Sequence, residues 1–451
     1  MSRRLAALAG AQLIIALDHN IVYVVLPVID RELNFGGTTE QWVVSSYSLA
    51  FGGLLLVGGR LTDALGPHDV FVAALAVYAG ASALGGIATE PGVLVAARAG
   101  QGGGGALLFP ATVAALKTGF AEGPERARAL AAWGAAGAAG GAAGSLVGGS
   151  LAAALGWRAV FLVNLPLAAL VGSVGWSRLS RAPAGRVPVP WRHVPVALAG
   201  AAAVALTLLA ATHAAAADWS YPTVASVLAA AALLAAAFQA LERRSGDRLV
   251  PAHVLRAGHA AAAVAVAFVF MASFGSQLYL LTVYLQESRG AGPFLTGVAL
   301  LPLTAAVFAG TQIGGGVGRR LGDVGATVAG LLVGAGGMIA CAGAVAASSA
   351  IWLAVAMTVV GLAQGVTWTA RWGLATAGPS RRDGSVAGVV ATAQQIGGAV
   401  GLALLVSLVG AARPALDRGV TVAFVTVGAL LAAVAVLTPR LARPRRRLGC
   451  G

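Results

Sequence analysis

Long apolar stretches alternate with short polar connectors along almost the whole chain. A helix that crosses a bilayer needs about 20 mostly apolar residues, and fourteen stretches reach that length. Many connectors contain Pro, Gly or charged residues, which is typical of breaks between helices. The pattern therefore predicts helices at 5–28, 41–59, 70–89, 92–115, 129–152, 156–176, 194–212, 222–241, 260–284, 294–315, 325–345, 350–370, 385–410 and 419–438.

The composition excludes the main alternatives to a membrane protein. Hydrophobic residues make up 58% of the 451 residues and charged residues only 10%, and the mean hydropathy is +0.84. An average soluble domain has about 25% charged residues, and a disordered chain is far more polar than this one. The 63 glycines suit close packing of helices in a bilayer. The chain is predicted to be an all-α polytopic membrane protein.

The net charge of +14 is a topology signal. With both termini in the cytoplasm, 24 of the 30 Lys and Arg residues fall on the cytoplasmic side, five fall outside and Arg98 lies within a helix. Arg371 is counted on the cytoplasmic side, directly after the predicted helix 350–370. This asymmetry follows the positive-inside rule. The positive charge is therefore expected to contact anionic lipid rather than nucleic acid.

A short repeat suggests a duplicated architecture. The segment 59–66 reads GRLTDALG after the second predicted helix, and 318–325 reads GRRLGDVG after the tenth. If the helices 194–212 and 222–241 are a central insertion, these connectors are equivalent in two six-helix halves. Parallel halves of this kind are a transporter pattern.

Two ionisable residues are predicted well inside the membrane, where charge is costly and marks a functional candidate. Asp18 would lie about 15 Å and Arg98 about 9 Å below the outer surface, at 1.5 Å per residue. A neighbouring cation favours the ionised carboxylate and burial favours the neutral one, so Asp18 is a candidate for reversible proton binding. The alternative to a functional role is a static ion pair of the two residues, or an arginine that extends to the membrane surface. His19 either relays protons or only packs.

The sequence contains no pattern for another chemistry. The ATP-binding loop G-x-x-x-x-G-K-[ST] is absent, because Lys117 is the only lysine. No His or Cys cluster has metal-ligand spacing. No Ser-His-Asp arrangement or pair of intramembrane carboxylates indicates an enzyme. We expect neither an enzymatic activity nor a cofactor or metal.

Several segments resemble the major facilitator superfamily, in its fourteen-helix drug:proton antiporter branch. The first helix reads LDHNIVYVVLP at 17–27, similar to the L-D-x-T-I-V-N-V-A-L-P of that branch, with Asn20 and Tyr23 at its Thr and Asn positions. The second helix opens with QWVVSSYSL at 41–49, similar to Q-W-V-x-x-x-Y-x-L.

Motif A of the family, G-x-L-x-D-R-x-G-R-R, is represented at 59–68. Gly59, Asp63 and Gly66 keep their places, whereas Ala64 stands in place of a basic residue. In the family this connector steadies one conformation through charge contacts. The resemblance therefore implies a weaker latch in this chain.

Two further motifs fall on the fourth and fifth predicted helices. Motif B, R-x-x-Q-G-x-G, is complete with Arg98, Gln101, Gly102 and Gly104, and the family assigns its arginine to proton coupling. Motif C, the antiporter signature, has Ser145 where proline is usual. Its glycines are Gly140, Gly144, Gly148 and Gly149. Further matches are GWRAVFLVNLP at 156–166, YLQ at 284–286, LP at 301–302 and QQIGGA at 394–399.

The resemblance implies a major facilitator fold with two six-helix lobes and two inserted central helices. The lobes would be 1–176 and 260–451, with 177–259 between them. Asp18 and Arg98 would couple protons to transport. Residues implied to control conformation are Gly59, Asp63, Gly66, Gly140, Gly144 and Gly148. Candidates for a substrate cavity between the lobes are His19, Tyr23, Gln101, Gln277 and Gln394.

The predicted function is proton-coupled export of a hydrophobic drug or antibiotic. The expected partners are that small molecule, protons and membrane lipids, with no nucleic acid. We expect a monomer that crosses the cell membrane many times, with both termini in the cytoplasm. One alternative is facilitated or differently coupled export of a small metabolite in the same fold. The other is a membrane sensor or assembly partner that transports nothing.

Overall fold

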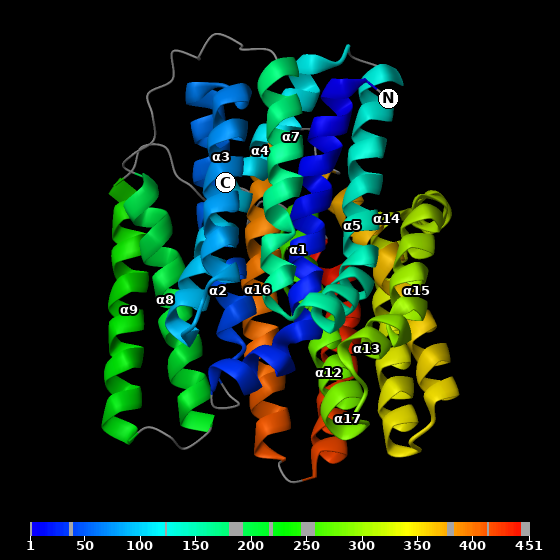
Figure 1. The fold of residues 1–451 in the computed structure, drawn as a ribbon. Coiled ribbons are helices and arrows are strands. Elements are labelled where there is room, and N and C mark those ends of the chain that lie inside the picture. Colours follow the sequence, from blue (N-terminus) through cyan, green and yellow to red (C-terminus); the bar gives the residue numbers. More distant parts are fainter. Residues whose placement is uncertain are drawn as a thin grey trace, which may run out of the picture. The chain divides into compact units, whose positions relative to one another are not determined.

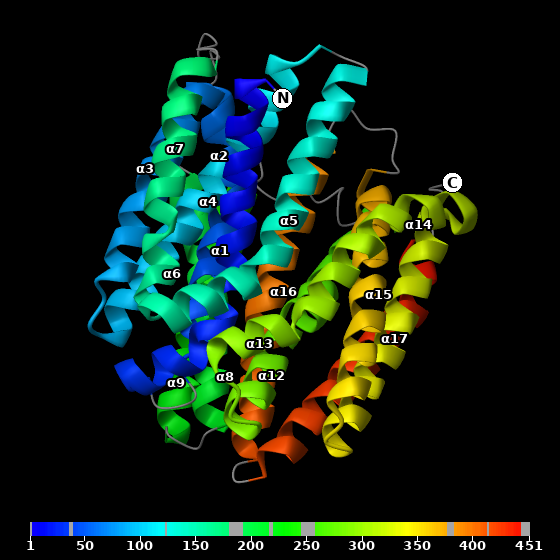
Figure 2. The ribbon, with the colours of Figure 1, turned by 45° about the vertical axis from the view of Figure 1, so that its right-hand side comes forward.

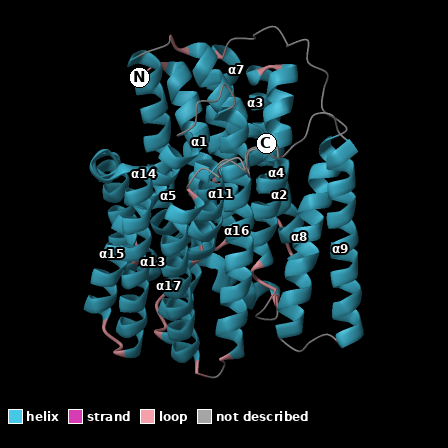
Figure 3. Cartoon of the chain, turned by 180° about the vertical axis from the view of Figure 1, so that it is seen from behind, coloured by secondary structure: helices cyan, strands magenta, loops and turns pink. Residues whose placement is uncertain are grey.

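The computed structural model describes residues 2–35, 39–121, 124–179, 193–215, 220–244, 258–376, 383–412 and 415–442. Every regular element within these ranges is a helix (Figure 3). The chain forms two compact units (Figure 1). The first comprises Met1–Arg244 with Leu281–Leu301, and the second comprises Ser245–Leu280 with Pro302–Gly451. The segment 281–301 thus packs within the first unit, although both of its neighbours in the chain belong to the second.

Sequence signals explain the helix ends of the first unit. At the start of α1, the Ser2 hydroxyl accepts a hydrogen bond of 3.3 Å from the Leu5 amide, as a helix cap does. Several other helices begin at proline, which suits the first helical turn. The helices are α1 Arg3–Leu33, α2 Trp42–Leu65, α3 Pro67–Gly86, α4 Pro91–Gly119, α5 Pro124–Leu155, α6 Arg158–Leu162, α7 Asn164–Arg178, α8 His193–Ala215, α9 Tyr221–Arg244 and α13 Pro293–Ala299.

The first described helix of the second unit is interrupted by π-helical turns. Such turns are frequent at functional sites. The interrupted helix continues into the part of the chain that packs with the first unit. The elements in chain order are α11 Gly258–Phe270, η1 Met271–Gly275, α12 Gln277–Val283 and η2 Tyr284–Ser288. The remaining helices are α14 Leu301–Ala346, α15 Ala350–Thr376, α16 Asp383–Ala411 and α17 Leu416–Leu441.

Many of these helices are long and apolar enough to cross a membrane. Nine meet that test in the part of the chain that the structure describes, or up to eleven if each of two bent helix pairs is one span. The span Pro293–Ala346 contains two predicted helices, 294–315 and 325–345, which are divided at Gly322. The protein is a helical multi-pass membrane protein, and the count of fourteen spans stays a prediction.

The two helices predicted at 194–212 and 222–241 are present as α8 and α9. The two helices lie side by side in Figures 1 and 3. α8 also packs against α2, so the pair belongs to the first unit.

The two copies of the short repeat form the same kind of turn. Gly66, between α2 and α3, has φ 89° and ψ 151°, and Gly322, within α14, has φ 70° and ψ 162°. A side chain disfavours this backbone conformation, so glycine is needed at both turns. The structure therefore pairs Gly66 with Gly322, whereas the sequence match pairs it with Gly325.

One predicted helix boundary is wrong. The sequence pattern ends a helix at 370 and places Arg371 in a connector, but α15 continues to Thr376 and Arg371 is completely buried. Trp368 and Trp372 lie on either side of it in the chain, and both rings cover its guanidinium. Because aromatic faces attract a cation, the charge is buried within the helix instead of ending it.

Candidate functional site

The centre of the candidate site is an ion pair buried within the first unit. Asp18 lies in α1 and Arg98 in α4, and neither side chain has any exposed surface. Arg98 Nη1 donates to Asp18 Oδ2 over 2.6 Å. A charge-assisted contact of this length is among the stronger hydrogen bonds in proteins. Each group compensates the charge of the other, which burial requires.

Further hydrogen bonds surround both charges. Gln101 Nε2 donates to Asp18 Oδ1 over 3.2 Å, and Asn164 Nδ2 donates to the same oxygen over 2.9 Å. Arg98 also donates to Gln101 Oε1 over 2.9 Å and, through Nε, to the carbonyl oxygen of Val43 over 2.8 Å. Both carboxylate oxygens thus accept hydrogen bonds, from side chains on α4 and α7.

Motif B brings Arg98 to this place because its glycines let α4 approach two neighbouring helices. A Cβ at Gly102 would lie 2.3 Å from the carbonyl oxygen of Tyr47 on α2. A Cβ at Gly104 would lie 3.0 Å from the backbone nitrogen of Tyr78 on α3. Any larger residue would push α4 away from its neighbours, and the arginine would lose its register with α1.

The glycines of motif C hold α5 against α1, the helix that carries the buried carboxylate. A Cβ at Gly140 would lie 2.5 Å from the carbonyl oxygen of Leu13, and one at Gly148 would lie 2.7 Å from that of Ile21. Gly144, between them, faces α1 at a similar distance. Small residues allow such close helix contacts, so this part of motif C fixes the position of α1.

The next face of α5 packs against α13 (Figure 2). A Cβ at Gly149 would lie 2.4 Å from a backbone oxygen of α13, and one at Gly297 would lie 2.7 Å from the carbonyl oxygen of Ser145. Before α13, Gln286 Nε2 donates to the carbonyl oxygen of Val24 on α1 over 2.7 Å. These contacts explain why the segment 281–301 packs with the first unit.

Aromatic side chains cover the ion pair. The guanidinium of Arg98 lies over the ring of Tyr47, 4.4 Å from its centroid. The ring of His19 contacts those of Tyr47 and Tyr23, with centroid distances of 5.8 and 6.1 Å. Among the described residues, the buried Nε2 of His19 has no hydrogen-bond partner. His19 thus contacts aromatic rings, whereas the adjacent carboxylate binds arginine and amides.

The other two predicted cavity residues lie in the second unit, in separate contacts. Gln277 Nε2 donates to Gln364 Oε1 over 2.8 Å. Gln394 accepts a hydrogen bond from Arg371. The structure therefore groups three of the five cavity candidates around the ion pair in the first unit, and places Gln277 and Gln394 elsewhere.

The motif A residues lie at the end of α2, away from the buried network. Gly66 makes the turn described above, and Asp63 is exposed. A Cβ at Gly59 would meet no atom within 4 Å, but one at Gly58 would lie 2.2 Å from the carbonyl oxygen of Ala106 on α4. Packing therefore requires a glycine at 58 rather than at 59.

Sequence reasoning missed three residues of these arrangements. Asn164 stands within the matched segment 156–166, and that match was the signal that identifies it. Ser82, whose Oγ accepts from Gln101 over 2.8 Å, is a small polar residue in an apolar run and carries no signal of its own. Arg371 lies between two tryptophans, and that spacing indicates a shielded arginine.

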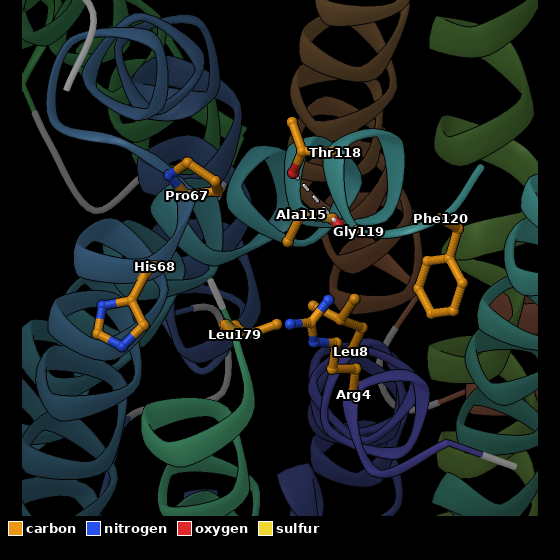
Figure 4. A pocket seen from close by; sticks show the side chains of 9 residues that line it. All are labelled: Arg4, Leu8, Pro67, His68, Ala115, Thr118, Gly119, Phe120 and Leu179. Atoms are coloured by element: carbon orange, nitrogen blue, oxygen red, sulfur yellow. Dashed lines mark hydrogen bonds between the residues drawn. The ribbon is translucent and has the colours of Figure 1, made fainter. Parts of the chain in front are cut away.

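A separate cavity of about 120 Å³ lies where α1 begins and α4 ends (Figure 4). His68 borders it, with Nδ1 2.7 Å from Asp69 Oδ1 and Nε2 3.3 Å from the carbonyl oxygen of Trp176. Arg4, also at the cavity, precedes Asp18 by about 21 Å along α1, so the cavity is not part of the network. Its lining residues are Arg4, Leu8, Pro67, His68, Ala115, Thr118, Gly119, Phe120 and Leu179.

The network consists of groups that accept and donate hydrogen bonds. Within the described ranges, no three His, Cys, Asp or Glu side chains are grouped to hold a metal ion. The network has one carboxylate, one permanent cation and two amides that can either donate or accept. Protonation of Asp18 would remove half of the ion pair and rearrange its hydrogen bonds.

Known proteins with related sequences are transporters. The profile of the Major Facilitator Superfamily matches residues 8–402. The chain is 36% identical over 411 residues to the puromycin resistance protein of Streptomyces alboniger, covering 89% of this chain and 80% of that protein. It is 34% identical over 451 residues to the cephamycin export protein of Amycolatopsis lactamdurans, covering 96% and 90%. The tetracenomycin C resistance and export protein of Streptomyces glaucescens is 31% identical, covering 89% and 74%.

Solved structures share the fold. A peptide transporter of the POT family, crystallised in complex with sulfate, has a TM-score of 0.72 at 15% identity, covering 98% of this chain and 96% of that one. At this identity the likeness shows the fold alone. The family profile spans most of the chain, and the buried network lies on the motifs by which the sequence resembles the family. The chain belongs to the major facilitator superfamily, a family of membrane transporters rather than enzymes.

Proposed function

We propose that this protein is a proton-coupled efflux transporter that exports a hydrophobic drug or antibiotic across the cell membrane. Two lines support the proposal. Relatives that align over most of the chain are resistance and export proteins for puromycin, cephamycin and tetracenomycin C. The observation that carries the coupling is the ion pair of Asp18 and Arg98, buried in apolar surroundings and fixed by Gln101 and Asn164.

The hydrogen bonds around Asp18 suggest how a proton is received. Asn164 donates to Asp18 Oδ1 with its amide nitrogen, while its own Oδ1 is buried without a partner in the described part of the chain. If that oxygen of Asp18 carried a proton, its O–H group and the amide N–H of Asn164 would both be donors, and no hydrogen bond could form between them. Rotation of the amide would then present the idle oxygen, which accepts the new proton. Asn164 can therefore serve both protonation states.

Arg98 supplies the link between protonation and movement. In the ionised state it ties α1 to α4 through Asp18 and also reaches α2 through the carbonyl oxygen of Val43. Neutralising the carboxylate removes the charged contact to α1 but leaves the contact to α2. In the proposed cycle, Asp18 takes a proton when the transporter faces outward and substrate leaves. It releases the proton when the transporter faces inward and substrate binds again.

The remaining expectations belong to the same proposal. The protein would act as a monomer, with both termini in the cytoplasm and its basic connectors against anionic lipid. Two six-helix lobes, 1–176 and 260–451, would be joined in the sequence by the linker 177–259 with its inserted pair of helices. Gln277, Gln394, His19 and Tyr23 remain candidates for contact with substrate.

Reconstitution into proteoliposomes tests the proposal against its alternatives. Puromycin, taken from the relative's name, is the first probe, followed by chemically different antibiotics. An imposed pH gradient should drive puromycin against its concentration gradient. Equilibration that ignores the pH gradient would indicate facilitated export. No movement of any compound, by protein that is folded and inserted, would favour the sensor or assembly partner.

A further inference from the structure

The second unit contains a buried arginine without a carboxylate. Arg371 in α15 has no exposed surface. Within the described residues, no acidic group lies within ion-pair distance of it. A buried ion without a counter-ion is unfavourable by several kcal/mol, and intramembrane arginines normally pair or mark a pathway. The surroundings of Arg371 therefore need a functional explanation.

Three aromatic rings form a cage around this guanidinium. Its central carbon lies 4.2 Å from the ring centroid of Trp368, 4.8 Å from that of Phe270 and 5.3 Å from that of Trp372. The two tryptophans come from α15 itself, and Phe270 is the last residue of α11. Ring faces attract a cation, so the cage stabilises the charge. It does not provide acceptors for the N–H groups.

Most donors of Arg371 remain unused. Nη2 donates to Gln394 Oε1 on α16. Nε and Nη1 are buried and have no hydrogen-bond partner among the described residues. A buried donor without an acceptor is destabilising by about 1–3 kcal/mol, and more where it is charged. The site therefore has the donors for an anion and lacks the anion.

The cage has one accessible side. Trp368 is 38% exposed, whereas Phe270 is 2% exposed. Gln364, Trp368 and Arg371 recur at helical spacing, so they share one face of α15. A ligand would reach the guanidinium from this side by displacing the exposed indole.

We propose that Arg371, Trp368, Trp372, Phe270 and Gln394 form a recognition site for the carboxylate of an aromatic molecule. The planar guanidinium matches a carboxylate through two parallel hydrogen bonds, and the rings stack on the adjoining aromatic body. The proposal rests on the proposed export function and adds to its substrates organic anions and zwitterions with a planar apolar part. Arg371 is the specificity-determining residue.

The test compares two probes of the same shape. 2-Naphthoate carries a carboxylate, and 2-naphthamide is its neutral counterpart. Binding to the purified full-length protein in nanodiscs is followed by calorimetry at one pH without any gradient. The unmodified protein should bind 2-naphthoate about 10- to 100-fold more tightly, the range of one charged hydrogen-bonded contact. It should also gain thermal stability from 2-naphthoate, since a ligand stabilises the state it binds.

Variants assign the preference to the cage. Arg371→Gln should bind the two probes equally while its affinity for 2-naphthamide stays unchanged, and Arg371→Lys should keep part of the preference. Arg440→Gln, at an exposed arginine of α17, is the matched control and should bind as the unmodified protein does. Equal binding of both probes by the unmodified protein would overturn the proposal. A full preference for 2-naphthoate in Arg371→Gln would also overturn it.

The outcome is separable from that of the proposed export function. Binding requires no proton gradient, so a 2-naphthoate preference in a protein that exports nothing would sustain the site and reject the transport proposal. Proton-driven export of a neutral drug by a protein with no 2-naphthoate preference would sustain the transport proposal and reject the site.

Discussion

The two units each bury an arginine in a different way. In the first unit, Arg98 contacts a carboxylate at 2.6 Å, an amide oxygen and a backbone carbonyl. In the second unit, Arg371 contacts one amide oxygen and three aromatic faces. The first charge is compensated within the protein, and the second is only shielded.

This difference separates two tasks. A compensated pair changes when a proton neutralises one partner, so it is suited to coupling. A shielded cation with free donors changes when an anion arrives, so it is suited to recognition. Both arginines are held by close helix contacts, which keep the donors at fixed positions. An arginine within an apolar helix is found in both cases, so the sequence alone does not distinguish coupling from recognition.

Removal of each arginine in turn should give the largest contrast. Arg98→Ala leaves the Asp18 carboxylate buried without a counter-ion and should destabilise the protein by about 3–5 kcal/mol, with loss of proton-driven export. Arg371→Met removes a charge that has no carboxylate partner, so stability should stay the same or rise. Retention of the monomer peak after heating, in one detergent, compares the variants.

The conservative variant Arg98→Lys controls for charge in this comparison. It keeps the cation but lacks the planar fork of donors, so it should recover part of the thermal stability and little export. Equal losses of stability in Arg98→Ala and Arg371→Met would contradict the distinction between a compensated and a shielded charge.

Asn164→Ala should reduce proton-driven export by a smaller amount than the loss of Arg98. The variant loses a hydrogen bond to the ionised carboxylate, a contact of about 1.5–3 kcal/mol, and also the amide oxygen proposed to accept from the protonated carboxyl. Because both protonation states lose a contact, the rate of export under an imposed pH gradient should fall while the pH profile keeps its position. Arg440→Gln, at an exposed arginine of α17, is the control and should export at the unmodified rate.

A single methyl group at a helix contact should affect only the site that the contact supports. A Cβ at Gly140 would lie 2.5 Å from the backbone of α1, and one at Gly401 would lie 2.2 Å from the carbonyl oxygen of Ala272. Each alanine substitution should destabilise by about 1–3 kcal/mol. Gly140→Ala should impair proton-driven export, and Gly401→Ala should weaken the 2-naphthoate preference.

Gly134→Ala is the matched control on α5, because a Cβ at Gly134 would meet no atom within 4 Å. It should resemble the unmodified protein in both assays. If Gly140→Ala also exported like the unmodified protein, the close contact of α5 would not be needed to position α1.

The sequence predicted the fold and the centre of the first site well. Apolar length and the distribution of arginines indicated the membrane helices, and the isolated charges of Asp18 and Arg98 indicated the buried pair. These signals are strong because a charge in a membrane is unfavourable unless it is compensated.

Other features depend on tertiary contacts that local patterns encode only in part. Arg371 was assigned to a connector because a charge at the end of an apolar run usually marks a helix end, and the burial of its charge depends on Phe270 from another helix. The partnership of Asn164 with Asp18 joins residues far apart in the sequence. Gly59 was expected to control conformation, but the close helix contact lies at its neighbour Gly58, since only the approach of α4 decides which face is close.

The most direct test of the coupling proposal uses Asp18→Asn in inverted membrane vesicles. The variant keeps the shape of the side chain and loses its titration. An imposed pH gradient drives uptake of one neutral and one cationic drug. We predict that uphill uptake of both drugs fails, while exchange down a concentration gradient survives. Retained uphill uptake of the neutral drug, with loss of the cationic one, would contradict it and make Asp18 only a counter-ion for cationic substrates.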